Sequence, residues 1–558
     1  MKKRFYIFMF SALAFVGQAW AAMPDGEEEE DIIIPVAIVN GETPYATLDG
    51  AFYSSTDSTV TNIQLVDDAK MGLIVLQKGV TVSLDLNGHK VEIESQGIYN
   101  YGTLTITDSS NGSGSMILDH GNVSMIYNYG ELTITGGIFT CSSQEVNAND
   151  ARRCLITFAG STTHIKGGTF SSTGQALCLA GETVIDTGTF STTGNCDVVA
   201  NYCTDKQLII NNGLFSNLAD IPSGNDVRRC LWTSTGTNTL IKGGTFTSGN
   251  HVLYLLGSAI VNGGNFTTTG NGFVVGNMSA NGDVAINGGT FTNLGSKPAE
   301  GTDQRYCVIS YQNTRTAITA GKFTSPYQVL VFNGDATVSG GEFVTTGNIN
   351  VVHNYNTTGE LVIKGGTFLN NCELPEDSPE TDNRRCLWAN VNTNTIINGG
   401  TFTNNSTAQT ITIYYGKATV SGGTITNNGH GSGIATNGNV EITGCRIKAW
   451  NMLICWAEGT MVCSGGLFSE PIPSSLLAEG CECIDNTDPG TMETYPYKVV
   501  KGTPGDVNGD GSVDVADIAS VISVMAGDGN YDAADVNGDG SVDVADIASI
   551  ISIMAGEN

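Results

Sequence analysis

The sequence predicts an all-β parallel β-helix solenoid followed by a small all-α calcium-binding domain. The solenoid is indicated by motifs such as IKGGTF at 165–170, in which alternating apolar and polar residues lead into a Gly-Gly turn and an aromatic residue. Near-copies recur through residues 109–468, mostly 20 to 34 residues apart. The segments between them are short, rich in Val, Ile and Thr, and lack helical periodicity, which favours stacked β-coils. The calcium-binding domain is indicated by an oxygen-rich loop that occurs twice after residue 505.

Three coils form a longer repeat of 76 or 77 residues. The steps between successive repeated phenylalanines, starting at Phe139, are 31, 20 and 25 residues, then 31, 20 and 25, then 32, 20 and 25. A polar insertion lies in each long step, and insertions such as 220–226 and 373–382 are too polar to lie inside a coil. We therefore expect four bulges on one flank, about 14 Å apart. Each bulge ends on a short motif, RRC or RYC, at 152–154, 228–230, 305–307 and 384–386.

Residues 1–22 have the pattern of a secretory signal peptide. Basic residues at 2–4 precede an apolar run at 5–16, and AWA at 19–21 provides a small-residue cleavage site. An acidic leader, 23–35, follows. No later stretch reaches the about 18 apolar residues of a spanning helix. We therefore expect a secreted or cell-surface protein without membrane insertion.

Residues 36–108 are expected to form an N-terminal cap and the first coils. A cap is needed because the first coil would otherwise expose an unpaired strand edge. The pattern predicts a short helical turn at 44–53 and strands at 74–77, 80–86 and 102–107.

A second cap is expected after the last coil. Pro471 and Pro473 interrupt strand pairing. A helix is expected at 474–479 with Ser474 as its N-cap, and a strand at 495–500. The expected segments after the solenoid are a cap at 469–500, a linker at 501–505 and the calcium-binding domain at 506–558.

Two phrases near the start of the solenoid resemble a known family. LDLNGH at 84–89, followed by GTLTI at 102–106, is similar to the opening of secreted β-helix proteins of the pectin-lyase-like superfamily. The resemblance implies a right-handed β-helix over residues 36–500. It implies little about activity, because one fold hosts many functions.

The last 53 residues contain two copies of a calcium loop. DVNGDGSVDVAD at 506–517 places oxygen-bearing side chains at loop positions 1, 3, 5, 9 and 12 and glycine at position 6, as in EF-hand loops. The copy at 535–546 is identical. Each loop runs forward into one helix, and position 12 is Asp instead of Glu. The apolar residues expected on one face of each helix are Ile518, Val521, Ile522 and Met525, and Ile547, Ile550, Ile551 and Met554.

A duplicated loop and helix of this kind resembles the dockerin family, which docks secreted polysaccharide-degrading proteins onto cohesin domains. The resemblance implies two calcium ions and a cohesin-like partner. In the family, loop positions 10 and 11 contact the partner; they are Val515, Ala516, Val544 and Ala545 here, where many dockerins carry hydroxyl residues, so the cohesin type stays open. The alternative is a C-terminal cap that calcium stabilises and that binds no partner. The implied calcium ligands are Asp506, Asn508, Asp510, Ser512, Asp514 and Asp517, and Asp535, Asn537, Asp539, Ser541, Asp543 and Asp546, with the serines acting through their backbone carbonyls.

Charge and cysteine content set further limits. The net charge of −30 excludes nucleic acid as a natural partner. Fourteen cysteines in an exported chain permit disulfides, and Cys141 with Cys154 and Cys372 with Cys386 are placed to close the first and last bulges. Cys230 and Cys307 have no such neighbour within their own bulges, so we expect buried thiols there.

Two short motifs bear on whether the solenoid is an enzyme. GHG at 429–431 and RIK at 446–448 match short signatures of β-helix polygalacturonases. That chemistry needs paired carboxylates, and no acidic residue lies between Asp382 and Glu441. A lyase would need clustered aspartates beside a basic residue, whereas the aspartates of the coils are scattered. We therefore assign no catalytic residue.

The bulges suggest a ligand site. Arginine beside a planar ring suits sugar hydroxyls and carboxylates, which predicts a ladder along the flank. The alternative is internal, with each arginine holding its own bulge through nearby carboxylates. The candidate ligand-binding residues are Arg152, Arg228, Arg305, Arg384, Trp232 and Trp388.

Two functions therefore stand at the level of sequence. The first is a secreted, calcium-binding dockerin protein with a non-catalytic, glycan-contacting or adhesin-like β-helix, associated with polysaccharide utilisation. The second is a polysaccharide lyase or glycoside hydrolase delivered by the same docking domain.

Overall fold

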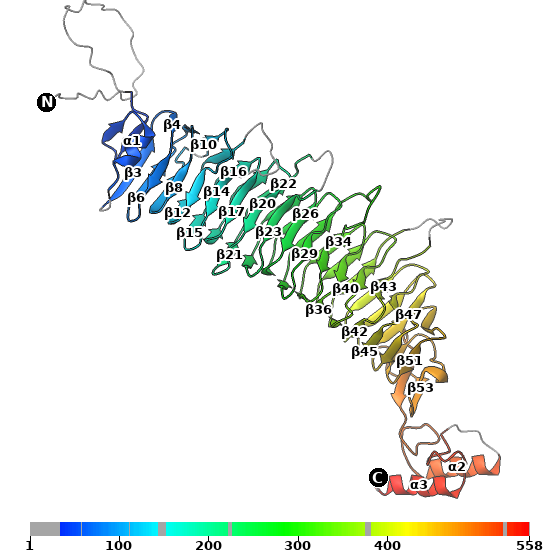
Figure 1. The fold of residues 1–558 in the computed structure, drawn as a ribbon. Helices are drawn as coiled ribbons and strands as arrows, with labels where there is room; N and C mark the ends of the chain where they lie inside the picture. The colour runs from blue at the N-terminus through cyan, green and yellow to red at the C-terminus, as the bar shows by residue number, and fades with distance from the viewer. Residues whose placement is uncertain are drawn as a thin grey trace, which may run out of the picture. The chain divides into compact units, whose positions relative to one another are not determined.

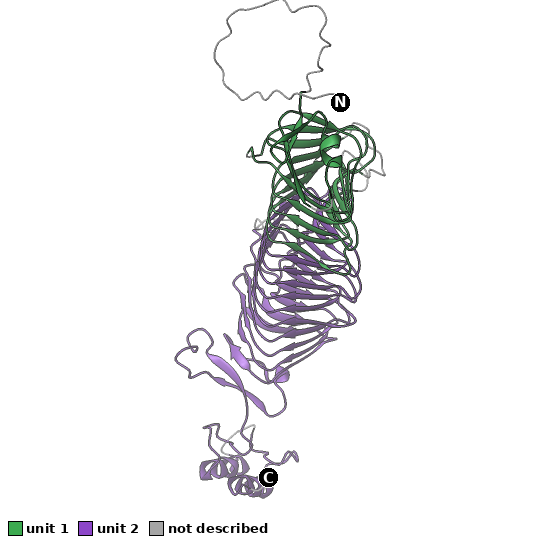
Figure 2. Cartoon of the chain, turned by 90° about the vertical axis from the view of Figure 1, so that its left-hand side faces the viewer, with its two compact units in different colours: residues 1–228 green, residues 229–558 purple. Residues whose placement is uncertain are grey.

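The computed structural model describes residues 34–556 apart from 57–58, 111, 143–151, 221–225, 374–380 and 528–532. The expected signal peptide and nearly all of the acidic leader lie outside the described residues. The chain divides into two compact units, residues 1–228 and 229–558 (Figure 2). Within the described ranges, no helix is long and apolar enough to cross a membrane.

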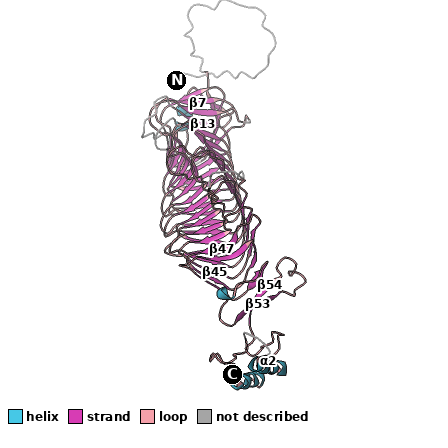
Figure 3. Cartoon of the chain, turned by 90° about the vertical axis from the view of Figure 1, so that its right-hand side faces the viewer, coloured by secondary structure: helices cyan, strands magenta, loops and turns pink. Residues whose placement is uncertain are grey.

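Each coil of the solenoid contributes one strand to each of three parallel sheets, A, B and C. In one coil these are β12 (Glu131–Ile134), β13 (Ile138–Cys141) and β14 (Arg153–Thr157). They pair in parallel with the equivalent strands of the next coil, β15 (Thr162–Ile165), β16 (Thr169–Ser172) and β17 (Gln175–Leu179). Strands dominate both units (Figures 1 and 3). The predicted parallel β-solenoid is confirmed.

The remaining strands of the first unit are listed by sheet. Sheet A contains β1 (Ala37–Val39), β2 (Thr43–Tyr45), β3 (Val60–Leu65), β6 (Thr81–Asp85), β9 (Thr103–Thr107), β18 (Glu182–Ile185) and β21 (Gln207–Ile210). Sheet B contains β4 (Ala69–Met71), β7 (Lys90–Ile93), β10 (Ser115–Leu118), β19 (Thr189–Thr192) and β22 (Leu214–Asn217). Sheet C contains β5 (Ile74–Leu76), β8 (Ile98–Asn100), β11 (Ile126–Asn128) and β20 (Asp197–Asn201).

The second unit repeats this arrangement. Its sheet A strands are β24 (Asn238–Ile241), β27 (Ser258–Val261), β30 (Asp283–Ile286), β33 (Arg315–Ile318), β36 (Asp335–Val338), β39 (Glu360–Ile363), β42 (Asn394–Ile397), β45 (Lys417–Val420), β48 (Asn439–Ile442) and β51 (Thr460–Cys463). Its sheet B strands are β25 (Thr245–Ser248), β28 (Asn265–Thr268), β31 (Thr290–Asn293), β34 (Lys322–Ser325), β37 (Glu342–Thr345), β40 (Thr367–Asn370), β43 (Thr401–Asn404), β46 (Thr424–Asn427), β49 (Arg446–Lys448) and β52 (Gly466–Phe468). Its sheet C strands are β23 (Arg229–Thr233), β26 (His251–Leu255), β29 (Val275–Asn277), β32 (Val308–Ser310), β35 (Leu330–Phe332), β38 (Val352–Asn354), β41 (Leu387–Ala389), β44 (Ile411–Ile413), β47 (Ser432–Thr436) and β50 (Asn451–Cys455).

The repeated phenylalanines form stacked columns in the core. Phe139, Phe170 and Phe190 are fully buried, and their ring centroids are 4.7 and 5.0 Å apart. This spacing follows the strand separation, so every coil places its ring over the previous one. The second Gly of each Gly-Gly turn makes room for the column. At Gly168, φ is +104° and an added Cβ would lie 3.2 Å from the carbonyl oxygen of Gly137, which explains why glycine recurs there.

The N-terminal cap combines an antiparallel strand with a short helix. β1 pairs antiparallel with β2 and β3. Helix α1 (Leu48–Tyr53) begins after Thr47, whose hydroxyl accepts a hydrogen bond from the amide of Gly50 at 3.1 Å. The helical turn predicted at 44–53 is therefore shorter, because its first residues belong to β2.

The C-terminal cap differs from the prediction. The helix expected at 474–479 is a single 3-10 turn, η1 (Ser474–Leu476). Ser474 is not its N-cap, since Pro473 occupies that position and provides no side-chain hydrogen bond. β53 (Cys481–Asp485) and β54 (Tyr497–Lys501) form an antiparallel hairpin, and β54 also pairs antiparallel with β52.

The expected disulfides across the bulges do not form. The Sγ atoms of Cys154 and Cys386 lie inside the coils, each within 3.2 to 3.4 Å of backbone carbonyls in two successive strands of sheet B. Cys307 has the same environment, at 3.5 and 3.2 Å, and burial raises the pKa of its thiol far above the ordinary value. Cys230 and Cys307 are buried, as predicted. These inward-facing cysteines are core residues of the bulge coils.

Candidate functional site

The first calcium loop is wound around the carboxylate of Asp506. Its Oδ1 accepts hydrogen bonds from the amides of Gly509 and Asp510 at 2.9 and 3.1 Å, and its Oδ2 accepts one from Gly511 at 2.8 Å. The backbone of Gly509 and Gly511 has φ of +73° and +90°. These left-handed conformations curl the loop, and glycine adopts them without a steric penalty.

Position 12 of the loop joins the loop to the helix. Asp517 is fully buried, and its carboxylate accepts from the amides of Val507, Asn508 and Asp514 at 2.7, 3.0 and 2.8 Å. Burial by itself raises the pKa of Asp517, but the backbone hydrogen bonds outweigh this effect and lower it. The residue therefore stays ionised and carries negative charge into the loop.

The second loop has the same geometry. Asp535 accepts from the amides of Asp539 and Gly540 at 3.1 and 2.8 Å. Asp546 accepts from Asn537 and Asp543 at 3.1 and 2.9 Å and is also fully buried. Identical sequence thus gives two equivalent loops within one small domain.

The chemistry of the loops suits calcium. The side-chain donors are hard carboxylate and amide oxygens, and the backbone carbonyls of Ser512 and Ser541 stand at position 7. Among the described residues, no group of three or more Asp, Glu, His or Cys side chains is placed to hold a metal by itself. A calcium shell here would therefore draw on the Asn508 and Asn537 amides and on backbone oxygens as well, as EF-hand loops do.

Each loop leads into a capped helix. Asp514 and Asp543 are the N-caps of α2 (Val515–Ala526) and α3 (Val544–Met554), and each forms a capping box with the aspartate at loop position 12. A buried cluster packs these helices and loops together, and it consists of Val507, Val521, Ala534 and Ile550.

The helix faces differ from the prediction at two positions in each copy. Ile522 and Met525 are exposed by 51% and 43%, and Ile551 and Met554 by 52% and 44%. They do not share the buried face with Val521 and Ile550, because the core is filled from Ile518, Val524 and Ile547. Four large apolar side chains are thereby left on the surface of the domain.

Comparison with known families gives the same assignment for this region. Residues 504–554 match the dockerin type I domain. The C-terminal region is a dockerin domain. Dockerins bind cohesin domains, and type I dockerins bind calcium. No curated protein and no solved structure matches the chain.

The residues expected to contact the partner lie on the surface of the dockerin. Val515 and Val544 are exposed by 71% and 69%, and Ala516 and Ala545 are exposed as well. Together with the exposed apolar residues of each helix they make up two sets of exposed apolar residues of matching composition, called patch 1 and patch 2. Patch 1 is Val515, Ala516, Ile522 and Met525, and patch 2 is Val544, Ala545, Ile551 and Met554.

In the solenoid, each of the three bulges whose contacts are described is held by an arginine. Arg305 donates from Nε and Nη2 to Asp303 at 2.8 and 2.6 Å, and from Nη1 to the carbonyl of Gly295 at 3.0 Å. Asn293, at the end of β31, accepts from the amide of Gly295 at 3.0 Å and donates to the carbonyl of Gly272 at 2.7 Å. The equivalent residues of the neighbouring bulges are Asn217, Asp226 and Arg228, and Asn370, Asp382 and Arg384.

These arginines are hardly accessible. Arg152 and Arg305 are exposed by 2% and 6%, and the side chains of Arg228 and Arg384 by 16% and 13%. Most of the first bulge, which would carry the carboxylate partner of Arg152, lies outside the described residues. The contacts of the other three support the internal role over the ligand ladder.

One of the two bulge tryptophans meets a different arginine from the predicted one. Trp388 packs with its ring 4.8 Å from the guanidinium carbon of Arg385 and 5.4 Å from the ring of Tyr414. Trp232 is in register with Tyr254 on the next strand of sheet C. Both tryptophans are half-buried. The sequence motif alone did not show which arginine of the pair packs on the tryptophan.

The polygalacturonase-like tripeptide GHG at 429–431 is a structural turn. The amides of Gly429 and Gly431 both donate to Asn427, at 3.0 and 2.9 Å. His430 has φ of +62°, and its ring packs edge-on against Trp450 at 5.1 Å. Turn geometry accounts for this motif.

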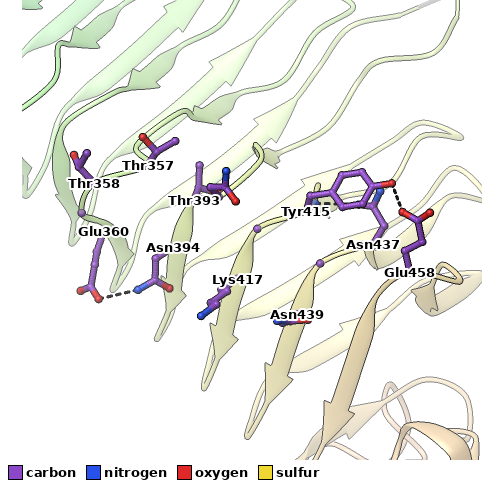
Figure 4. A pocket seen from close by; sticks show the side chains of 14 residues that line it. Thr357, Thr358, Glu360, Thr393, Asn394, Tyr415, Lys417, Asn437, Asn439 and Glu458 are labelled. Carbon is purple, nitrogen blue, oxygen red and sulfur yellow. Dashed lines mark hydrogen bonds between the residues drawn. The ribbon is translucent and has the colours of Figure 1, made fainter.

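A polar groove of about 690 Å³ lies on the second unit, at the corner between sheets C and A (Figure 4). Five successive coils line it with residues 357–360, 392–394, 415–417, 437–439 and Glu458. The groove is not evident from the sequence, because its residues are spread over about a hundred positions and each stretch has the composition of an ordinary turn. The one local signal is Tyr415, which stands in a tight turn before glycine.

Proposed function

We propose that the protein is a secreted, non-catalytic β-solenoid that contacts glycans and is attached to cohesin-bearing partners through its dockerin, in the service of polysaccharide utilisation. The observation that carries the proposal is the dockerin itself, with two equivalent calcium loops and the exposed residues of patch 1 and patch 2.

Bound calcium would hold each loop in one conformation, and the helices that carry the docking residues start from these loops.

The solenoid supports a binding role because its bulge carboxylates are engaged by arginine and its groove is lined by amide, hydroxyl and carboxylate groups. The groove carboxylates Glu360 and Glu458 lie four coils apart, about 19 Å by strand spacing. Hydrolysis of a glycosidic bond needs two carboxylates about 5 to 9.5 Å apart. This separation favours binding over hydrolysis.

The docking role is tested by capture of the full chain on immobilised type I cohesin domains, with calcium and with EDTA. We expect capture only with calcium. Failure to bind a panel of type I cohesins in calcium would contradict the proposal.

The non-catalytic role is tested separately. Reducing-sugar and unsaturated-uronate release from pectins, xylans and host glycans should stay at the buffer level. Release of sugar that increases with the concentration of the protein would overturn this part of the proposal and leave the docking role in place.

A further inference from the structure

The groove of the second unit contains an exposed tyrosine that is held by hydrogen bonds. The side chain of Tyr415 is 41% exposed, and its hydroxyl donates a short hydrogen bond to Oε2 of Glu458. Its backbone amide donates to Oδ1 of Asn437 at 3.1 Å, and its carbonyl accepts from the amide of Asn392 at 3.1 Å. The two neighbouring coils therefore hold the backbone of Tyr415, and Glu458, two coils further along, holds its hydroxyl (Figure 4).

The backbone at Tyr415 is also unusual. Its φ is +50°, in the left-handed region that bulky residues rarely occupy. The other non-glycine residues with positive φ are Asn or His within the described part of the chain. Strained backbone of this kind persists where the surroundings impose it and often accompanies a binding site. Here it holds an aromatic ring on the wall of a polar groove.

The charges of the groove restrict the ligand. Glu360 and Glu458 stand toward its two ends, and Lys417 lies between them (Figure 4). The whole chain carries a net charge of −30. A polyanion such as a polyuronate would meet repulsion from the carboxylates and from the overall field. An uncharged ligand meets no such penalty.

We propose that this groove binds an uncharged glycan chain laid across successive coils, with one sugar ring packed on Tyr415. The apolar face of a sugar ring packs on an aromatic ring, and its hydroxyls pair with side chains that both donate and accept hydrogen bonds. Asn394 and Asn439 offer such groups, and the amide of Asn394 already donates to Glu360 at 2.8 Å. This site rests on the proposed glycan-contacting function and specifies where and what class of glycan the solenoid contacts.

The test is calorimetric titration of the full chain with cellohexaose, xylohexaose, mannohexaose and polygalacturonate. We expect at least one neutral hexasaccharide to bind and polygalacturonate not to bind. Tyr415→Ala should weaken the neutral glycan by about tenfold or more, whereas Tyr415→Phe, which keeps the ring, should stay within about threefold. Tyr311→Ala is the matched control, because Tyr311 is an equally exposed tyrosine at a corner outside the groove, with 44% exposure; it should bind as the parent does. Thermal unfolding of each variant checks folding.

The outcomes distinguish failure of the proposed groove site from failure of the proposed glycan-contacting function. If a neutral glycan binds and Tyr415→Ala, folded, binds as well as Tyr311→Ala, the groove is not the site while the glycan-contacting function stands. Binding of polygalacturonate alone overturns the uncharged class. Binding of no glycan, in this panel or on a glycan array, overturns the glycan-contacting function itself.

Discussion

Arg305 and Asp303 form an ion pair that is almost removed from solvent, with side chains 7% and 13% exposed. Replacing Arg305 by Ala leaves a buried carboxylate without its partner, and we expect a loss of about 3–5 kcal/mol in the free energy of unfolding. Arg315 pairs with Asp283 at 2.6 Å on the surface, with side chains 70% and 50% exposed. Arg315→Ala is the control and should cost about 0–1 kcal/mol. Urea unfolding followed by tryptophan fluorescence measures both. Equal losses would show that the bulge arginine is not an internal clamp.

Asp382 gives the same clamp a pH dependence. Burial raises the pKa of this carboxyl, but hydrogen bonds from Arg384 and Thr407 and the charge of Arg384 outweigh it and hold the pKa well below the usual range. Because the folded pKa lies below the unfolded value of about 3.9, the stabilisation is complete above that pH and is lost as the pH falls further. The stability difference between the parent chain and Asp382→Asn should thus be largest near neutral pH and shrink below about pH 4. A difference that stays constant down to pH 3 would rule out this linkage.

At the scale of the element, α2 and α3 carry patch 1 and patch 2, two sets of exposed apolar residues of matching composition. A cohesin that binds patch 1 should also bind patch 2, with the dockerin turned around, which gives two equivalent binding modes. Ile522→Asp or Ile551→Asp alone then removes one mode and should weaken binding by about twofold. The double variant should abolish binding, because either binding mode would then bury an introduced aspartate in the interface with the cohesin. Surface plasmon resonance on an immobilised cohesin measures this.

Met492→Asp is the matched control for these helix variants. It makes the same kind of change at an apolar residue that is 46% exposed, in the C-terminal cap outside the dockerin. It should leave cohesin binding unchanged. The symmetric docking idea fails if one single variant stays folded, as judged by circular dichroism, and yet loses all binding.

At the scale of the whole molecule, the dockerin has a core of its own around Val521 and Ile550, and residues 505–558 hold eleven acidic residues and no Lys or Arg. Without calcium these carboxylates repel one another, so metal binding should be coupled to folding of this domain. Differential scanning calorimetry should show that EDTA lowers or removes a small transition and leaves the large solenoid transition in place.

Titration of the same chain with calcium should give two ions per molecule. Asp510→Ala and Asp539→Ala should each reduce this number to one, because each variant loses one loop. A chain that binds no calcium would contradict the coupling of metal binding to folding. A large transition that shifts with EDTA as much as the small one would contradict independent folding of the dockerin.

The local and periodic features were predictable from sequence because they depend on contacts within one turn or one repeat. The inward position of Phe139, Phe170 and Phe190, the glycine turns and both calcium loops follow from spacing and residue type. The helix expected at 474–479 does not form. A single 3-10 turn follows Pro473, and the chain soon enters β53, which pairs with β54. Composition alone carries no information about that pairing.

The sequence by itself determined the parallel β-solenoid, its three-coil period and the dockerin, because each of them arises from a motif that is repeated along the chain. The tertiary structure decided which polar groups meet. It placed Cys154 and Cys386 against backbone carbonyls instead of in disulfides, buried the predicted ligand arginine Arg305, and left Ile522 exposed. It also assembled a groove around Tyr415 from five coils. The physical reason is that contacts between coils join residues 20 to 40 positions apart, and only the stacking register brings those residues together.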